Sequence, residues 1–264
     1  MPGFNPHAAA RVLALARLEH RAVAALSSDM APADAAAGYA VQRHLHELLS
    51  AAGEGPVAGH KIGCTTKVMR EKLGIDQPCA GQVHARRLLT NGGSWNVGGL
   101  IKPSVECEIA VRLGRDLPPV SRYYTAASLW PAVDSCMASI ELCDDRYADR
   151  EAVGVPTLIA DDFYNVGCAL GEEIPNWQAI DLAAITGTMR INGRETRRGK
   201  GSDIMDHPLN ALAWLANLRA SDGQHLKAGE FVTLGSIVSS QRVAPGDRVE
   251  IEIEKLGGIR LQIA

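Results

Sequence analysis

The stretch VECEIAVRL, residues 105–113, predicts a β-strand and sets the pattern for the second half of the chain. Its side chains alternate between polar and apolar, as they do in a strand whose two faces meet different surroundings. Glu106 and Glu108 therefore share one face, and the apolar residues beside them share the other. Two carboxylates on one face repel each other, so this face lies either in water or around a bound cation.

A segment near the C-terminus repeats the alternation and keeps the solvent explanation open. VEIEIE, residues 249–254, places Glu250, Glu252 and Glu254 on one face, which we interpret as a face exposed to water. Alternation alone does not separate this arrangement from that of Glu106 and Glu108.

A third carboxylate favours a site. In SIELCDDR, residues 139–146, Glu141 shares a face with Ser139 and Cys143, opposite Ile140 and Leu142. If the two strands are neighbours, three carboxylates meet. Three oxygen ligands of this kind favour a hard cation, Mg²⁺ or Mn²⁺.

Further strands follow from about residue 100, separated by glycine, asparagine and proline. The runs are NVGCALG (165–171), TMRINGRET (188–196), FVTLGSIV (231–238) and VEIEIEKLGGIRLQI (249–263). Asn192-Gly193 and Gly257-Gly258 each predict a tight hairpin turn. One helix interrupts the strands, because His207-Pro208 precedes a run with helical spacing that ends near residue 220.

The N-terminal part is predicted to be helical. Residues 6–26 and 33–52 carry apolar side chains at helical spacing, with Asp34 placed to begin the second helix and Gly53 to end it. Residues 57–63 are then extended, and a short helix over residues 67–73 ends at Gly74. We therefore expect an α+β protein with a helical N-terminal region, residues 1–55, and one β-rich catalytic domain, residues 56–264.

Composition excludes several classes of protein. The chain has 264 residues, 46% hydrophobic and 22% charged, with a net charge of −3, which is ordinary for a globular protein. Basic residues cluster only over residues 194–200, so no nucleic-acid partner is expected. No stretch approaches the ~20 apolar residues of a membrane span, and the first residues do not form a signal peptide.

The cysteines point to a reducing compartment. They lack metal-binding spacing, so we expect reduced thiols in the cytoplasm; they are Cys64, Cys79, Cys107, Cys136, Cys143 and Cys168.

Four segments in one order resemble a known family. They are HKIGCTTKVMREKLGIDQP (60–78), IKPSVECEIAVRLGRDLP (101–118), SIELCDDR (139–146) and GKGSDIMDHPLNALAWLANLRASDG (199–223). Together they resemble the 2-keto-4-pentenoate hydratase and 4-oxalocrotonate decarboxylase group of the fumarylacetoacetate hydrolase superfamily, across residues 30–264. The resemblance implies a rolled, mostly antiparallel β core with peripheral helices, and a homo-oligomer.

The resemblance also implies a metal site and a catalytic lysine. Glu106, Glu108 and Glu141 match the metal ligands of the family, and Lys61 matches a lysine beside the substrate, although an ordinary surface lysine is the other explanation. Cys79 stands where family hydratases carry an aspartate that helps with proton transfer, and a thiol is a poorer general base. Asp76 in the same loop is the alternative acid or base, unless it only caps a turn.

Substrate-binding candidates complete the set. Tyr164 stands where the family tends to have a small hydroxyl residue, Leu234 where a threonine is common, and Ser236 follows in the same strand. GKGS, residues Gly199, Lys200, Gly201 and Ser202, offers backbone N–H groups for a substrate carboxylate, or forms only a flexible hairpin end.

The implied activity is that of a divalent-metal-dependent lyase. Its substrate would be a small 2-oxo or 2-hydroxydienoate acid, hydrated as in 2-keto-4-pentenoate breakdown during catabolism of aromatic compounds. Decarboxylation of the 4-oxalocrotonate type and hydrolysis of an acylpyruvate are alternatives within the same superfamily. A binding protein that has kept the fold but lost the chemistry is the alternative outside enzymes.

Overall fold

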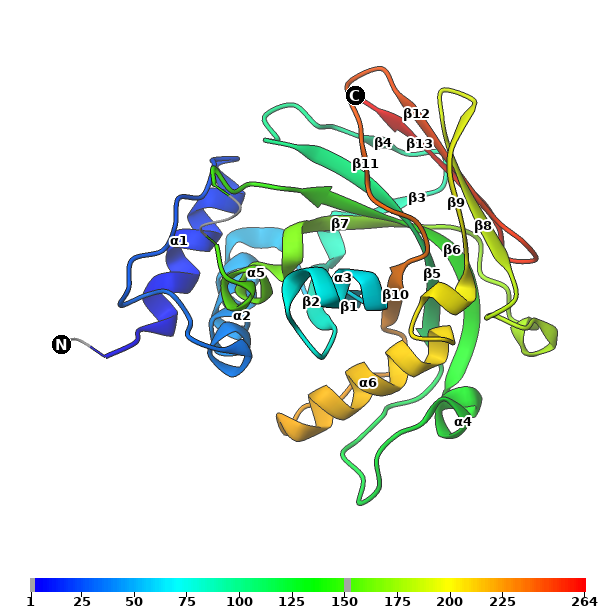
Figure 1. The fold of residues 1–264 in the computed structure, drawn as a ribbon, viewed down its shortest axis with the longest axis horizontal. Coiled ribbons are helices and arrows are strands. Elements are labelled where there is room, and N and C mark those ends of the chain that lie inside the picture. Colours follow the sequence, from blue (N-terminus) through cyan, green and yellow to red (C-terminus); the bar gives the residue numbers. More distant parts are fainter. Residues whose placement is uncertain (1–2, 150–152) are drawn as a thin grey trace.

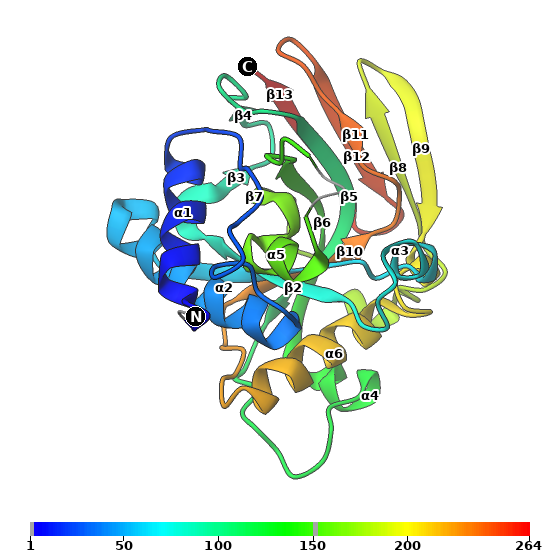
Figure 2. The same ribbon diagram turned by 60° about the vertical axis from the view of Figure 1, so that its left-hand side comes forward.

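The structure, a computed structural model, describes residues 3–149 and 153–264. Two β-sheets form the body of the protein, and the labelled helices lie along one side of it, away from β8, β9, β12 and β13 (Figures 1 and 2). The helices are α1 Pro6–Leu18, α2 Ala35–Leu49, α3 Lys67–Leu73, α4 Ala126–Leu129, α5 Val155–Ala160 and α6 Pro208–Ser221. Single helical turns occur at Ser50–Glu54, Ala85–Arg87, Trp130–Ala132, Asp162–Tyr164, Trp177–Ala179 and Gly201–Asp203.

The larger sheet has the order β2-β1-β10-β5-β6-β7-β3, with β11 beside β5, and the smaller has the order β4-β13-β12-β8-β9. Among the described residues the pairings are antiparallel except β1–β10, β3–β7 and β4–β13, which confirms the mostly antiparallel core. The strands are β1 Val57–Gly63, β2 Cys79–His84, β3 Leu88–Thr90, β4 Ser94–Trp95, β5 Pro103–Leu113, β6 Val133–Asp144, β7 Asn165–Leu170, β8 Thr186–Ile191, β9 Arg194–Lys200, β10 Phe231–Ser236, β11 Gln241–Arg242, β12 Arg248–Ile253 and β13 Gly257–Ile263.

The first helix is shorter than its sequence pattern predicts. Helix α1 ends at Leu18, and His20 has a left-handed backbone with φ of 50°. Val23 then pairs with Tyr147 through hydrogen bonds on both sides, so tertiary pairing overrides the helical spacing that extends to residue 26. The start of α2 agrees with its prediction, because the Asp34 carboxylate accepts a hydrogen bond from the Ala37 amide at 2.8 Å.

One of the two predicted hairpin turns is misplaced. Asn192 and Gly193 have φ of 54° and 77°, as a type I′ turn between β8 and β9 requires. The second turn lies at residues 254–256, earlier than predicted, with Lys255 at φ 62°. Gly258 is already in β13, opposite Glu252, because the pairing of β12 continues to Ile253.

Strand β12 confirms the solvent interpretation of VEIEIE. Val249, Ile251 and Ile253 are buried, whereas the Glu252 side chain is 71% exposed. Residues of α1 and α2 share one apolar core with both sheets. The division at residues 55 and 56 therefore stays a prediction. No helix in the described ranges has the length and apolar character needed to cross a bilayer.

Candidate metal centre

The pairing of β5 with β6 brings the three glutamates together. Glu106 lies opposite Glu141 in the register, and Glu108 lies opposite Ser139, so all three carboxylates leave the same face. Each offers an oxygen, and these oxygens lie within 4.8 Å of one another. Glu108 is 0% exposed and Glu141 1%, while Glu106 is half-buried. This face therefore differs from that of β12, because it is not open to water.

The contacts of these carboxylates leave room for a cation. Glu108 accepts a hydrogen bond from the Gly235 amide at 3.0 Å through Oε2, but its buried Oε1 has no hydrogen-bonding partner in the described ranges. Glu141 Oε1 accepts from Asn165 Nδ2 at 3.0 Å and lies 3.1 Å from Lys61 Nζ. Three carboxylates beside one ammonium would leave two negative charges, which a divalent cation balances.

The electrostatics of the site agree with that requirement. Burial, with the charge of Glu141 added, raises the pKa of Glu106 to about 7 and raises the pKa of Glu108 well above its usual range. Burial alone would lower the pKa of Lys61, but the neighbouring acidic groups, Glu141 first among them, raise it above its ordinary value. Lys61 is therefore an ammonium at neutral pH, and its neighbours need a cation to be fully ionised.

Metal binding and proton binding should compete at this site. A carboxyl whose pKa is raised in the folded state stabilises the metal-free fold below its unfolded pKa, and this stabilisation is lost as the pH rises through about 7. We expect Mg²⁺ or Mn²⁺ to raise the midpoint of thermal unfolding more at about pH 8 than at about pH 5.5. Differential scanning fluorimetry with and without metal measures the rise of the unfolding midpoint at each pH. Equal rises at the two pH values would contradict competition between metal and protons.

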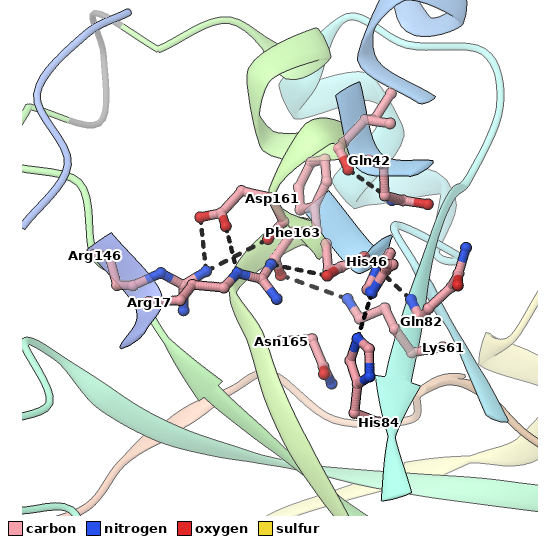
Figure 3. Close-up of polar contacts among 12 residues, drawn as sticks. Arg17, Gln42, His46, Lys61, Gln82, His84, Arg146, Asp161, Phe163 and Asn165 are labelled. Carbon is pink, nitrogen blue, oxygen red and sulfur yellow. Dashed lines mark hydrogen bonds and ion pairs between the residues drawn. The ribbon is translucent and has the colours of Figure 1, made fainter. Parts of the chain in front are cut away.

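Lys61 is enclosed on several sides in β1. It is 3% exposed, and its Nζ lies 3.5 Å from the Phe163 carbonyl oxygen and 6.0 Å from the centre of the Phe163 ring. Figure 3 shows Lys61 between Phe163 and Asn165. A Cβ added at Gly81 would lie 3.0 Å from Lys61 Cγ, so the neighbouring strand β2 approaches closely. A buried ammonium held this way is not an ordinary surface lysine.

Cys79 lies next to this lysine, but its thiol resists ionisation. It is buried in β2 opposite Gly63 of β1. Its hydrogen bond to Cys64, together with burial, raises the pKa of Cys79, whereas the same contact lowers the pKa of Cys64. Cys79 is thus suited to holding a proton and not to removing one. Asp76 is exposed in the loop before β2, in contrast to the buried groups around Lys61.

The substrate-binding candidates occupy two places. The Ser236 hydroxyl lies near Glu106 and donates to the Val238 carbonyl oxygen at 2.6 Å, and Tyr164 follows Phe163 directly and is half-buried. The GKGS segment ends β9 beside Ile237, where a Cβ on Gly199 would lie 1.8 Å from the Ile237 carbonyl oxygen. The Lys200, Gly201 and Ser202 amides already donate to Asp203, Ile185 and Ala183, so binding a carboxylate through them would require exchanging these partners.

Several residues of the site carry no obvious signal in the sequence. Asn165 begins the apolar strand β7, where a lone polar residue is the one hint of its contact with Glu141. Gly235 supplies its amide to Glu108 and has φ of 108°, and Ser240 lies close enough to Glu106 to lower its pKa. Cys64, half-buried with φ of 60°, directly follows the segment 57–63 that is predicted to be extended.

Comparison with known proteins places the fold in a family. The sequence profile described as fumarylacetoacetate (FAA) hydrolase C-terminal matches residues 82–264. The chain is 35% identical over 254 residues to 2-keto-4-pentenoate hydratase 2 of Dechloromonas aromatica, covering 96% of this chain and 95% of that protein. It is 28% identical over 244 residues to 4-oxalocrotonate decarboxylase of Pseudomonas putida, covering 92% and 91%.

A solved structure agrees with these matches. The structure of 4-oxalocrotonate decarboxylase from Pseudomonas putida G7, complexed with magnesium and adipate, superimposes with a TM-score of 0.90 at 26% identity, covering 98% of this chain and 97% of that one. Sequence and fold agree over nearly the whole described chain, and the chain belongs to the fumarylacetoacetate hydrolase family.

Proposed function

We propose that this protein is a divalent-metal-dependent lyase acting on a small 2-oxo or 2-hydroxydienoate acid, with hydration of a 2-keto-4-pentenoate-type substrate as its reaction. The observation that carries the proposal is the convergence of three carboxylates, two of them fully buried, beside the Lys61 ammonium. Glu106, Glu108 and Glu141 would hold Mg²⁺ or Mn²⁺. The 35% identical hydratase and the magnesium complex of the related decarboxylase support this assignment.

A bound divalent cation would supply positive charge for the carboxylate and 2-oxygen of the substrate. The residues of the chain supply the rest. Lys61 places a second positive charge where negative charge develops on an enolate, and its raised pKa keeps it protonated there. The buried Phe163 restricts water around this ammonium, which strengthens its field.

Decarboxylation of a 4-oxalocrotonate-type acid is the second candidate, and two observations favour it. The related decarboxylase covers 98% of the chain with a TM-score of 0.90. The thiol at Cys79 has a raised pKa and stays protonated, so it is a poor base for activating a water, a step that decarboxylation does not need. Both reactions use the same negative charge on the 2-oxygen, so the metal centre serves either.

The test is a substrate panel. Purified protein with added Mg²⁺ or Mn²⁺ is mixed with 2-hydroxypenta-2,4-dienoate, 4-oxalocrotonate and an acylpyruvate, following the conjugated chromophore and release of CO₂. We expect metal-dependent loss of the dienol without CO₂. Release of CO₂ would identify the decarboxylase instead, and acylpyruvate cleavage would identify a hydrolase. No turnover of any acid would favour a binding protein that has lost the chemistry.

A single substitution separates the first two reactions. Cys79→Asp restores the carboxylate that the family resemblance places there, and we expect it to increase hydration relative to decarboxylation because a carboxylate can act as a base. Cys136→Ser, at a buried thiol of β6 whose pKa is raised by burial alone, is the matched control and should leave the ratio of the two reactions unchanged. A lower hydration rate in Cys79→Asp would mean that the thiol is itself part of the hydratase.

The setting of the enzyme follows from its surface and cysteines. We propose a homo-oligomer, because Val12, Leu15 and Leu18 leave apolar side chains of α1 exposed at 39%, 49% and 37%. The six cysteines are free, which agrees with the cytoplasm as its location. Asp76 and the GKGS segment remain candidates for proton transfer and substrate binding.

A further inference from the structure

A buried charge network joins the N-terminal helices to the catalytic region. Arg17 of α1 spans two adjacent carboxylates, with Nε 2.7 Å from Asp161 Oδ1 and Nη2 2.8 Å from Asp162 Oδ2. Arg146 approaches Asp161 from another side at 2.6 Å. Figure 3 shows both arginines converging on Asp161. Asp161 and Asp162 are each 0% exposed, so removing a partner leaves a buried charge uncompensated.

Two histidines extend the same network. His84 Nδ1 lies 2.9 Å from the Gly55 carbonyl oxygen, His84 Nε2 lies 2.8 Å from His46 Nδ1, and His46 Nε2 lies 2.9 Å from Asp162 Oδ1. Both outer partners are acceptors, so the three contacts need three ring protons, one more than two neutral rings hold. All three contacts are therefore hydrogen bonds only when the pair carries one positive charge. Burial lowers the pKa of His84.

These charges hold an unfavourable turn. Asp162, Phe163 and Tyr164 have φ of 52°, 50° and 73°, three consecutive non-glycine residues in the left-handed region. L-residues with a Cβ seldom adopt this conformation, and they keep it only where the surroundings fix it. Asp162 is fixed by Arg17, by His46 and by the Gln82 amide, which donates to its Oδ1 at 3.1 Å. The side chain of the first turn residue is thus its anchor.

The same turn presents the groups that surround Lys61. The Phe163 carbonyl oxygen lies 3.5 Å from Lys61 Nζ, and the Phe163 ring lies 6.0 Å away. Asn165, directly after the turn, donates to Glu141 at 3.0 Å. Any change in the path of the turn therefore moves the carbonyl and ring of Phe163 relative to Lys61. It also moves the side-chain amide of Asn165 relative to Glu141.

We propose that Arg17 and His46 are positioning residues, which act through Asp162 to hold the left-handed turn that places Phe163 against Lys61. The proposal rests on the proposed function for its kinetic test. It assigns the helical N-terminal region, α1 and α2, a direct part in aligning the catalytic lysine, in addition to its packing.

The experiment compares Arg17→Met, Arg17→Lys and His46→Gln with two controls, using the full chain loaded with Mg²⁺. Arg17→Met should lower kcat by about 10²-fold, the scale of a displaced catalytic group, with KM and Mg²⁺ affinity changing less than about threefold. Arg17→Lys should lower kcat less than Arg17→Met does, because an ammonium keeps the charge but reaches one carboxylate at a time. His46→Gln keeps a donor toward Asp162 without the charge and should lower kcat by about tenfold.

The controls separate positioning from stability. Leu13→Ala removes a fully buried side chain one helical turn from Arg17, and it destabilises α1 without touching the carboxylates. Arg21→Met removes an arginine that is 59% exposed and paired with Glu19. Both should keep kcat within about threefold, measured where each variant is folded. Equal losses of kcat in Leu13→Ala and Arg17→Met would overturn the proposal.

A readout independent of activity covers two remaining outcomes. If Arg17→Met does not fold, the kcat of His46→Gln tests the proposal. If the wild type turns over no acid, crystal structures of the folded variants test it. We expect residues 162–164 to leave the left-handed region and Lys61 to lose the Phe163 carbonyl, with the three glutamates unmoved. A turn and a lysine that stay in place would overturn the proposal, whichever reaction the enzyme catalyses.

Discussion

Replacing Glu108 by glutamine should weaken Mg²⁺ binding and lower turnover by at least about 10²-fold each, because it removes a negative ligand and keeps the side-chain shape. The amide oxygen of glutamine can still accept the Gly235 N–H, so the local backbone contact is retained. Excess Mn²⁺ should restore part of the activity by mass action. Isothermal titration with Mn²⁺ and steady-state kinetics measure the two effects.

The stability of the metal-free Glu108→Gln variant provides a second test. Glu108 is 0% exposed beside two other carboxylates, where its ionised form is disfavoured, so an uncharged glutamine should leave the metal-free protein at least as stable as the wild type near neutral pH. Glu252→Gln is the control, since Glu252 comes from the similar sequence VEIEIE but is 71% exposed. It should change neither affinity nor turnover. Unchanged metal affinity in Glu108→Gln would contradict the ligand assignment.

Replacing Lys61 by methionine should separate catalysis from metal binding. The substitution removes the ammonium 3.1 Å from Glu141 and keeps most of the apolar stem. Mg²⁺ affinity should be kept or increase, because a positive charge beside the site is gone, whereas kcat should fall by about 10²-fold or more, the typical loss of one electrostatic stabiliser. Titration calorimetry and the dienol assay measure these opposite outcomes.

The metal-free form of Lys61→Met should also be less stable than the metal-free wild type, since Glu141 loses a partner in a buried environment. Mg²⁺ should remove this difference in stability. Lys67→Met is the control, because the Lys67 side chain is 83% exposed on α3. Turnover that survives in Lys61→Met would remove the lysine from the catalytic set.

Much of the fold could be predicted because its signals are local. Alternation along VECEIAVRL and VEIEIE predicted strands and the faces of their glutamates, and Asn192-Gly193 predicted a hairpin turn that the structure contains. Residues 19–26 were predicted wrongly as helix, because Val23 is held by a pairing with Tyr147, far along the chain. The sequence pattern contains no record of such a partner.

The site divides in the same way. Strand alternation predicted that Glu106 and Glu108 share a face. Whether that face is exposed to water or lines a binding site depends on the β5–β6 register, which the sequence does not specify. The resemblance supplied that step. The contacts of Asp161 and Asp162 with Arg17 and His46 span 144 and 116 residues, and three left-handed residues without glycine leave no sequence signature.

If Glu106, Glu108 and Glu141 bind one divalent cation, crystals grown with Mn²⁺ and measured near the manganese absorption edge should contain one anomalous peak within about 2.3 Å of an oxygen of each carboxylate. This peak should be lost in Glu108→Gln at the same Mn²⁺ concentration. A manganese peak elsewhere, with no metal at these three carboxylates at saturating Mn²⁺, would contradict this assignment of the ligands.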